Sequence, residues 1–337
     1  MFGSLFKNFR TPLVLIITLV MFIYGSIAGN NYQDTLSSYK ENVTGLTMME
    51  NDVDTALPQT AVYDIIYDHL TGSLPEGKTV KKAIVIGYDG CRLDTFTLFD
   101  DAHESAVNTL LKDGGEAWVS YCGGTNYHTI NTQFTSTAPG WCSMLTGEWA
   151  TVHGVINNGI PKSNKHLTLL TTAVEDGTIG SSAFYVSWDG HFVDSDSTYI
   201  NELQYIKDND LNVSFVDAGG DDGTRANVLA DLAKEDCSDF IFSIFEYPDH
   251  TGHDTGFSIN NPDYVQAFYD AEQTGCEIIS AIKSRPTYET EDWLILITSD
   301  HGGYNTGHGM CTMQERMTFI VTNKDLVLLD TGFGSMC

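Results

Sequence analysis

Positively charged residues are scarce in this chain. It has 337 residues, with 17 Lys and Arg against 45 Asp and Glu, and its net charge is −28. A surface of this sign repels nucleic-acid phosphates and anionic lipid headgroups, which excludes a nucleic-acid-binding surface. It also repels small anionic substrates, so a site for such a substrate needs local positive charge from another source. Bound metal ions are the obvious source.

The chain also lacks any pair of cysteines separated by two residues. This absence argues against a zinc knuckle and against a thioredoxin-like redox site. The odd number of cysteines, seven, leaves at least one of them unpaired within a monomer. One or more disulfides remain open for an exported chain, and their pairing does not follow from the sequence.

No apolar stretch reaches the length of a typical membrane span. The longest is the run of 15 mostly apolar residues at 13–27, which follows Lys7 and Arg10. This length and the basic flank are typical of a signal peptide, with Ser26 and Ala28 as small residues for cleavage. Residues 1–29 are therefore predicted to be an export signal, with an uncleaved membrane anchor as the alternative. In both cases the remainder is expected outside the cytoplasm, and membrane contact is expected only through this segment if it stays uncleaved.

The next 49 residues, 30–78, are interpreted as a polar spacer followed by one helix. Residues 30–57 are polar and aperiodic, which indicates a spacer. Residues 58–70 carry apolar side chains at helical spacing and predict an amphipathic helix on the outside of the core. The remainder, 79–337, is predicted to form one catalytic domain.

Within this domain, short apolar runs alternate with amphipathic segments. The runs predict buried strands and the segments predict helices. This alternation predicts an α/β fold, a doubly wound and mostly parallel sheet with helices on both faces. The expected strands are residues 83–88, 117–121, 183–187, 213–217, 239–245, 293–298 and 317–322, and the expected helices include 102–112, 135–146 and 263–283.

Potential metal ligands follow three of these strands. Open α/β sheets bind their ligands at the carboxyl ends of the strands, so these side chains should meet at one edge. Three carboxylates and three imidazoles at such an edge predict a site for two divalent ions. Mixed ligation of this kind favours Zn²⁺, with Mn²⁺ as a weaker alternative because it prefers oxygen. The predicted ligands are Asp89 after 83–88, Asp249 and His253 in a loop after 239–245, and Asp300, His301 and His308 after 293–298.

A hydroxyl group is expected beside these ligands, at the start of the helix over 135–146. Pro139 suits the first turn of a helix, and Thr137 stands just before it. The positive end of a helix favours an anion or an alkoxide at this position. An ordinary helix cap is the simpler interpretation of Thr137 alone.

Jointly these motifs resemble the alkaline phosphatase superfamily, and within it the type I phosphodiesterase/nucleotide pyrophosphatase branch. The resemblance covers residues 82–322 and rests on T-x-P at Thr137, P-D-x-x-G-H at Asp249, S-D-H-G-G at Asp300 and G-H-G at His308. It implies a nucleophile, Thr137, that also binds metal and is transiently phosphorylated, and an amide, Asn158, that donates to a phosphate oxygen. It further implies one ion held by Asp89, Asp300 and His301, and a second ion held by Asp249, His253 and His308.

The resemblance implies an exported two-metal phosphoric ester hydrolase that acts on a small phosphate ester, with a phosphomonoesterase as the alternative. No Arg follows Thr137, which sets the chain apart from true alkaline phosphatases and from sulfatases. A sulfatase and a non-catalytic surface-binding protein are therefore the weaker alternatives. The family usually continues with a further helix and strand, so a short C-terminal end is also expected.

Overall fold

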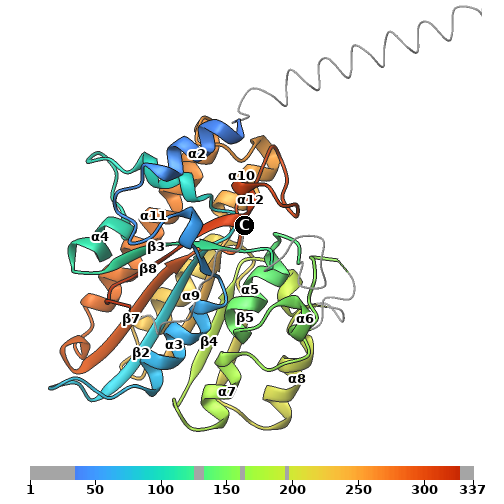
Figure 1. Cartoon of the computed structure of the whole chain (residues 1–337). Helices are drawn as coiled ribbons and strands as arrows, with labels where there is room; N and C mark the ends of the chain where they lie inside the picture. Colours follow the sequence, from blue (N-terminus) through green and yellow to red (C-terminus); the bar gives the residue numbers. More distant parts are fainter. Residues whose placement is uncertain (1–34, 125–132, 160–163, 194–196, 327–337) are drawn as a thin grey trace, which may run out of the picture.

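The computed structural model describes residues 35–124, 133–159, 164–193 and 197–326, and its centre is a mixed eight-stranded sheet (Figure 1). The strand order is β1-β3-β8-β7-β2-β6-β4-β5. Only β8 runs antiparallel, to both β3 and β7, and the other paired strands are parallel. The strands are β1 (Leu57–Pro58), β2 (Val80–Tyr88), β3 (Glu116–Tyr121), β4 (Ser182–Val186), β5 (Val213–Asp217), β6 (Phe240–Phe245), β7 (Glu291–Thr298) and β8 (Met317–Thr322).

Helices cover both faces of this sheet (Figure 1). One face is covered by α2 (Leu36–Thr44), α4 (Ala106–Lys112), α9 (Asp221–Leu232) and α11 (Pro262–Lys283). The other is covered by α3 (Ala61–Thr71), α5 (Thr137–Thr146), α7 (Leu169–Glu175) and α8 (Ile200–Asp208). The expected α/β fold with a mostly parallel sheet is therefore confirmed. The remaining short elements are α6 (Ala150–His153), α10 (Tyr247–Thr255), α12 (Met313–Arg316), and the 3₁₀ turns Val53–Thr55, Leu93–Leu98, Asp189–His191 and Tyr288–Thr290.

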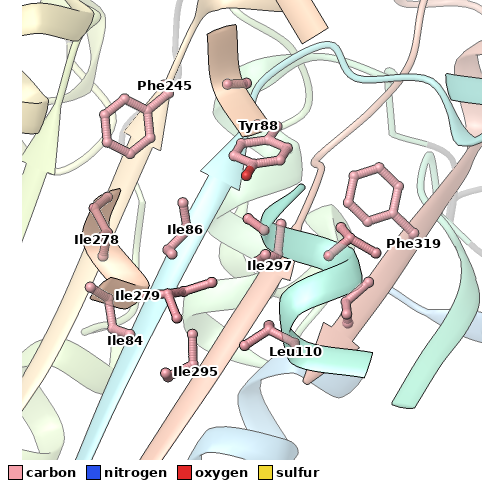
Figure 2. Packing of buried hydrophobic residues seen from close by; sticks show 14 of the residues in the cluster. Ile84, Ile86, Tyr88, Leu110, Phe245, Ile278, Ile279, Ile295, Ile297 and Phe319 are labelled. Carbon is pink, nitrogen blue, oxygen red and sulfur yellow. The ribbon is translucent and has the colours of Figure 1, made fainter. Parts of the chain in front are cut away.

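The apolar runs form central strands because both of their faces are buried. Along β2, Ile84, Ile86 and Tyr88 pack on one side of the sheet. Ala83 and Val85 pack on the other side. Successive side chains of a strand point to opposite faces, so a continuous apolar run is what a central strand needs. Figure 2 shows the first of these two cores, where the isoleucines of β2 and β7 meet Ile278 and Ile279 of α11.

The segment predicted as a spacer is folded from Leu36 on, so that prediction is wrong for residues 36–57. Tyr39 and Val43 lie on one face of α2 and are buried in the core. The Asn51 side chain accepts a hydrogen bond from Val119 N at 2.6 Å and donates one to Val119 O at 3.1 Å. Leu46, Met49 and Val53 also pack against this core, but they lie after the end of α2 and do not share one helix or strand.

The expected helix over residues 58–70 is α3, and Val62, Ile66 and Leu70 form its buried face. The expected export signal, residues 1–29, lies outside the described residues. Among the helices that are described, none combines the length and the apolar character needed to cross a membrane. The six cysteines in the described ranges are all unpaired, and four of them are buried.

A buried carboxylate on α8 gives the fold a predicted pH dependence. Glu202 Oε1 accepts hydrogen bonds from Thr168 N, Thr168 Oγ1 and Thr171 Oγ1, while Oε2 is buried without a partner. Burial raises the pKa of Glu202 from 4.5 to about 7. The protonated form is thus favoured in the folded chain, and its stabilising contribution is complete below pH 4.5 and lost as the pH rises to about 7.

We therefore expect Glu202→Gln to reduce the difference in free energy of unfolding between pH 5 and pH 8 by about 2–3 kcal/mol. Gln keeps the acceptor for the two threonines but has no charge to bury. Urea unfolding at the two pH values measures this difference. The exposed Glu148→Gln is the control, and an equal change in both variants would contradict the assignment to Glu202.

Candidate metal centre

Three neighbouring parallel strands, β7, β2 and β6, carry the predicted carboxylates past their C-terminal ends. Asp89 follows β2 directly, and Asp300 stands two residues after β7. Asp249 lies in α10, which follows β6. Because parallel strands end at the same edge of a sheet, the three side chains converge there.

The predicted loop around Asp249 and His253 is wrong, because these residues lie in the helix α10. Pro248 sits in the first turn, where a missing N–H is tolerated. Residues four apart lie on the same helix face, which brings His253 Nε2 to 3.4 Å from Asp249 Oδ2. The helix therefore supplies two ligand groups with a fixed spacing.

The ligand atoms form two groups that share one imidazole. Asp89, Asp300 and His301 offer atoms that lie within 4.8 Å of one another, and so do Asp249, His301 and His308. The His301 and His308 rings are stacked with their centroids 4.0 Å apart. From the sequence, His301 is assigned to one ion only, whereas in the structure it belongs to both ligand groups. His253 lies beside the second group, with its ring 4.9 Å from that of His308.

The three imidazoles are oriented alike. In each ring Nδ1 lies within hydrogen-bond distance of a backbone oxygen: Thr306 O for His253, Gly302 O for His301 and Thr135 O for His308. Since a carbonyl can only accept, Nδ1 carries the proton in the neutral ring and Nε2 presents a lone pair. Imidazoles that bind metal are held by such outer hydrogen bonds.

These lone pairs point at carboxylate oxygens. His301 Nε2 lies 3.5 Å from Asp89 Oδ1 and 3.3 Å from Asp300 Oδ2, and His308 Nε2 lies 3.7 Å from Asp249 Oδ1. Burial lowers the pKa of His301 well below its usual value and that of His308 to about 4, so both rings are neutral at pH 7. When the carboxylates are ionised, acceptors therefore face acceptors, and a cation between them relieves this repulsion.

The carboxylates require a cation for the same reason. Asp300 Oδ2 and Asp249 Oδ1 are buried and have no hydrogen-bond donor. Burial, followed by repulsion from neighbouring carboxylates, raises the pKa of Asp89 and Asp300 well above the usual value and that of Asp249 to about 8. Three aspartates and three histidines whose Nε2 atoms face carboxylate oxygens fit divalent metal ions with mixed oxygen and nitrogen ligands.

The hydroxyl of Thr137 lies at this centre. Thr137 is the first residue of α5, and its Oγ1 is 3.5 Å from both Asp89 Oδ1 and His301 Nε2. The helix can approach this closely because residue 140 is glycine: a Cβ there would lie 2.8 Å from Asp300 Cβ. The structure thus brings the predicted nucleophile next to the predicted ligands.

Asn158 joins the same helix end from a different segment. Its Oδ1 accepts a hydrogen bond from Ala138 N at 2.8 Å, in the first turn of α5. This contact holds the amide beside Thr137 and leaves its NH₂ group as a donor. All eight predicted site residues therefore gather at one end of the sheet.

Sequence reasoning missed Trp141, which contacts the predicted ligand Asp89. Its Nε1 donates to Asp89 Oδ2 at 2.8 Å, and the side chain is fully buried. The ring occupies space left by Gly87 of β2, where a Cβ would lie 2.5 Å from the indole. Its position four residues after Thr137, one turn along the expected helix, was the available signal.

We expect Trp141→Phe to weaken zinc binding about 10–100-fold, because outer-shell donors orient a ligand carboxylate. Competition with a chromophoric chelator measures the affinity. Trp118→Phe is the matched control, because Trp118 Nε1 donates to Glu116 Oε2 on β3, away from the centre. Equal affinities for both variants would contradict the role given to Trp141.

Comparison with known proteins agrees with the sequence resemblance. Residues 83–332 match the family model of type I phosphodiesterases/nucleotide pyrophosphatases. No curated protein sequence matches the chain. Among solved structures, mouse ectonucleotide pyrophosphatase/phosphodiesterase 5 in complex with AMP is similar with a TM-score of 0.45 and 20% identity, over 66% of this chain and 57% of that one.

Two bacterial structures are similar to the same extent. Alkaline phosphatase from the Antarctic bacterium TAB5 has a TM-score of 0.44 and 12% identity, over 71% of this chain and 90% of that one. Phosphonate monoester hydrolase of Agrobacterium radiobacter has a TM-score of 0.46 and 13% identity, over 72% and 68%. Likenesses this distant do not transfer an activity, and the chain spans just over half the length of the mouse protein. The family match, which covers most of the chain, is sufficient: this chain belongs to the type I phosphodiesterase/nucleotide pyrophosphatase family.

Proposed function

We propose that the chain is an exported phosphoric ester hydrolase with two divalent metal ions and a phospho-threonine intermediate. The observation that carries this proposal is the position of Thr137 Oγ1, which lies 3.5 Å from Asp89 and from His301 at the positive end of α5. A hydroxyl beside a metal centre and a helix N-terminus has two reasons to ionise and attack phosphorus. Export rests on the apolar segment 13–27 alone.

The ions proposed are zinc, with manganese as the alternative. Asp89, Asp300 and His301 would hold one, and Asp249, His253 and His308 the other, with the His301 imidazole within reach of both. When bound, they supply positive charge that neutralises the phosphate oxygens and lowers the pKa of coordinated oxygen. The side chains do the positioning: Thr137 is aligned for attack, and the Asn158 NH₂ group with the first amides of α5 binds phosphate oxygens.

The charge around the centre favours a diester over a monoester. Burial, followed by repulsion from Asp89 and Asp221, raises the pKa of Glu246 to about 9, and these three carboxyl groups lie close together at this end of the sheet. A monoester carries close to two negative charges at neutral pH, and a diester carries one. Repulsion therefore penalises the monoester more strongly.

Apolar side chains at the rim favour a diester for a second reason. Three exposed apolar side chains stand close in sequence to the site residues. Phe134 (42% exposed) is three residues before Thr137, Ile156 (49%) is two before Asn158, and Met310 (59%) is two after His308. Two hydrogen bonds hold these segments together. The backbone N–H of Phe134 donates to Ile156 O, and the side-chain hydroxyl of Thr135 donates to Met310 O. An exposed apolar rim next to a phosphate site fits the second ester group that only a diester has.

The test is hydrolysis of bis-p-nitrophenyl phosphate and p-nitrophenyl phosphate by the purified protein with zinc and with a chelator. We expect chelator-sensitive hydrolysis of both esters, with kcat/KM for the diester about tenfold higher or more. Higher kcat/KM for the monoester would reverse the order and support the phosphomonoesterase alternative. No chelator-sensitive hydrolysis of either ester would contradict the enzyme and support a non-catalytic binding protein. A p-nitrophenyl sulfate assay tests the sulfatase alternative.

A further inference from the structure

Four uncharged polar side chains are buried in and next to α5, the helix that begins with Thr137. None of them belongs to the two groups of metal ligands. They are Gln59, Gln133, Ser143 and His153, and each is at most 2% exposed. They come from four separate segments of the chain. Burying polar groups costs free energy unless they are hydrogen-bonded, so apolar side chains would hold the segments together more simply. Their contacts therefore call for a reason beyond stability.

The first half of this cluster has one arrangement of protons. His153 Nδ1 accepts from Val155 N at 3.0 Å, so in the neutral ring Nε2 carries the proton. Nε2 then donates to Ser143 Oγ at 3.1 Å, and the Ser143 hydroxyl donates to Gln133 Oε1 at 3.1 Å. Gln133 Oε1 also accepts from Ala150 N. Each donor thus meets an acceptor in one direction.

The second half continues in the same direction and reaches the metal centre. Gln133 Nε2 donates to Pro139 O and to Gln59 Oε1, both at 3.4 Å. Gln59 Nε2 donates to Gly140 O at 3.3 Å and to Asp300 O at 3.2 Å. Each of these hydrogen bonds pairs one donor with one acceptor. The backbone groups at the ends of the series fix the direction in which all of them are donated.

The atoms at the ends of this chain belong to the catalytic segments. Pro139 and Gly140 stand two and three residues after Thr137, and Val155 stands three residues before Asn158. We propose that Gln59, Gln133, Ser143 and His153 form a positioning network, which fixes the first turn of α5 relative to Asp300 and to the Asn158 segment. This inference rests on the proposed function and adds residues that control the reaction without touching the substrate.

The physical reason is directionality. Hydrogen bonds depend on direction as well as distance, so a connected series of them restricts the relative position of two elements more narrowly than apolar contacts do. A shift of about 1 Å in a reacting group can cost roughly 10²-fold in rate. Thr137 must meet the phosphorus in line, so small movements of α5 affect kcat before they affect substrate binding.

The experiment compares Ser143→Ala, His153→Asn and the double variant in the full chain loaded with zinc. In His153→Asn the side chain keeps an acceptor for Val155 N but is too short to reach Ser143. This variant therefore tests the network independently if Ser143→Ala does not fold. We expect each variant to lower kcat for bis-p-nitrophenyl phosphate about 10–100-fold, with KM within about threefold. The double variant should be no worse than the more severe single one, because both break the same chain.

The matched control is Ser182→Ala on β4, which removes a buried hydroxyl that donates to Leu170 O of α7. It should lose similar stability in urea with kcat unchanged. Zinc content is measured in every variant, and a loss of zinc in proportion to kcat would overturn the inference. So would kcat within twofold of the wild type in both single variants. If the wild type itself shows no chelator-sensitive hydrolysis, the proposed function has failed and the inference falls with it.

Discussion

Thr137→Ala is expected to lower kcat for bis-p-nitrophenyl phosphate by about 10³-fold or more, with zinc content unchanged. Removing a nucleophile abolishes the covalent route, and what remains is hydrolysis from binding and electrostatics alone. Thr137 is one of four oxygen or nitrogen groups in its half of the centre, and Asp89, Asp300 and His301 stay in place. Initial rates and metal analysis on the same preparation measure both quantities.

Thr146→Ala is the matched control for this variant. Thr146 lies at the other end of α5, and its hydroxyl donates to Cys142 O. It should keep wild-type kcat. Full activity of Thr137→Ala, or a parallel loss of zinc and activity, would contradict a nucleophile at this position.

The second large effect is expected from His301→Ala on metal-dependent stability. Zinc at about 1,000 times its Kd stabilises a protein by about 4 kcal/mol for each site. The His301 imidazole belongs to both ligand groups, so its removal should abolish most of the zinc-induced rise in melting temperature. His253→Ala removes a ligand beside only the second group, and about half of the rise should remain. Thermal unfolding with zinc and with chelator measures the difference.

If His301→Ala and His253→Ala lose the same fraction of the zinc-induced rise in melting temperature, His301 does not serve both ligand groups. The apo forms provide a check on the cause. Without metal, His301 holds no ion between Asp89 and Asp300, so its removal should destabilise the chelated protein much less than the zinc-loaded protein. A large destabilisation in chelator would indicate a packing role instead.

The sequence predicts the ends of the buried strands well because the apolar runs stop where the sheet edge meets solvent and ligands. Asp89 follows β2 without a gap, and Asp300 follows β7 after one serine. Ligand types and family motifs then identify the centre. The helical course of Asp249 to His253 was missed because α10 contains glycine, proline and mostly polar residues. Its packing against α11 stabilises the helix.

Contacts between distant segments could not be predicted in the same way. Trp141 meets Asp89 only because Gly87 leaves room for the indole ring. The hydrogen bonds from Gln59 to Gly140 and Asp300 join residues 81 and 241 positions apart. No periodicity reports such pairs, because each side chain alone is an ordinary polar residue.

The most direct test of the central claim is the number of zinc ions that full activity requires. Metal-free protein is titrated with zinc while bound metal and bis-p-nitrophenyl phosphate hydrolysis are measured on the same samples. A two-metal centre built from Asp89, Asp249, His253, Asp300, His301 and His308 predicts that hydrolysis reaches its plateau at two zinc ions per chain. A plateau at one ion per chain, or hydrolysis that does not depend on bound zinc, would contradict it.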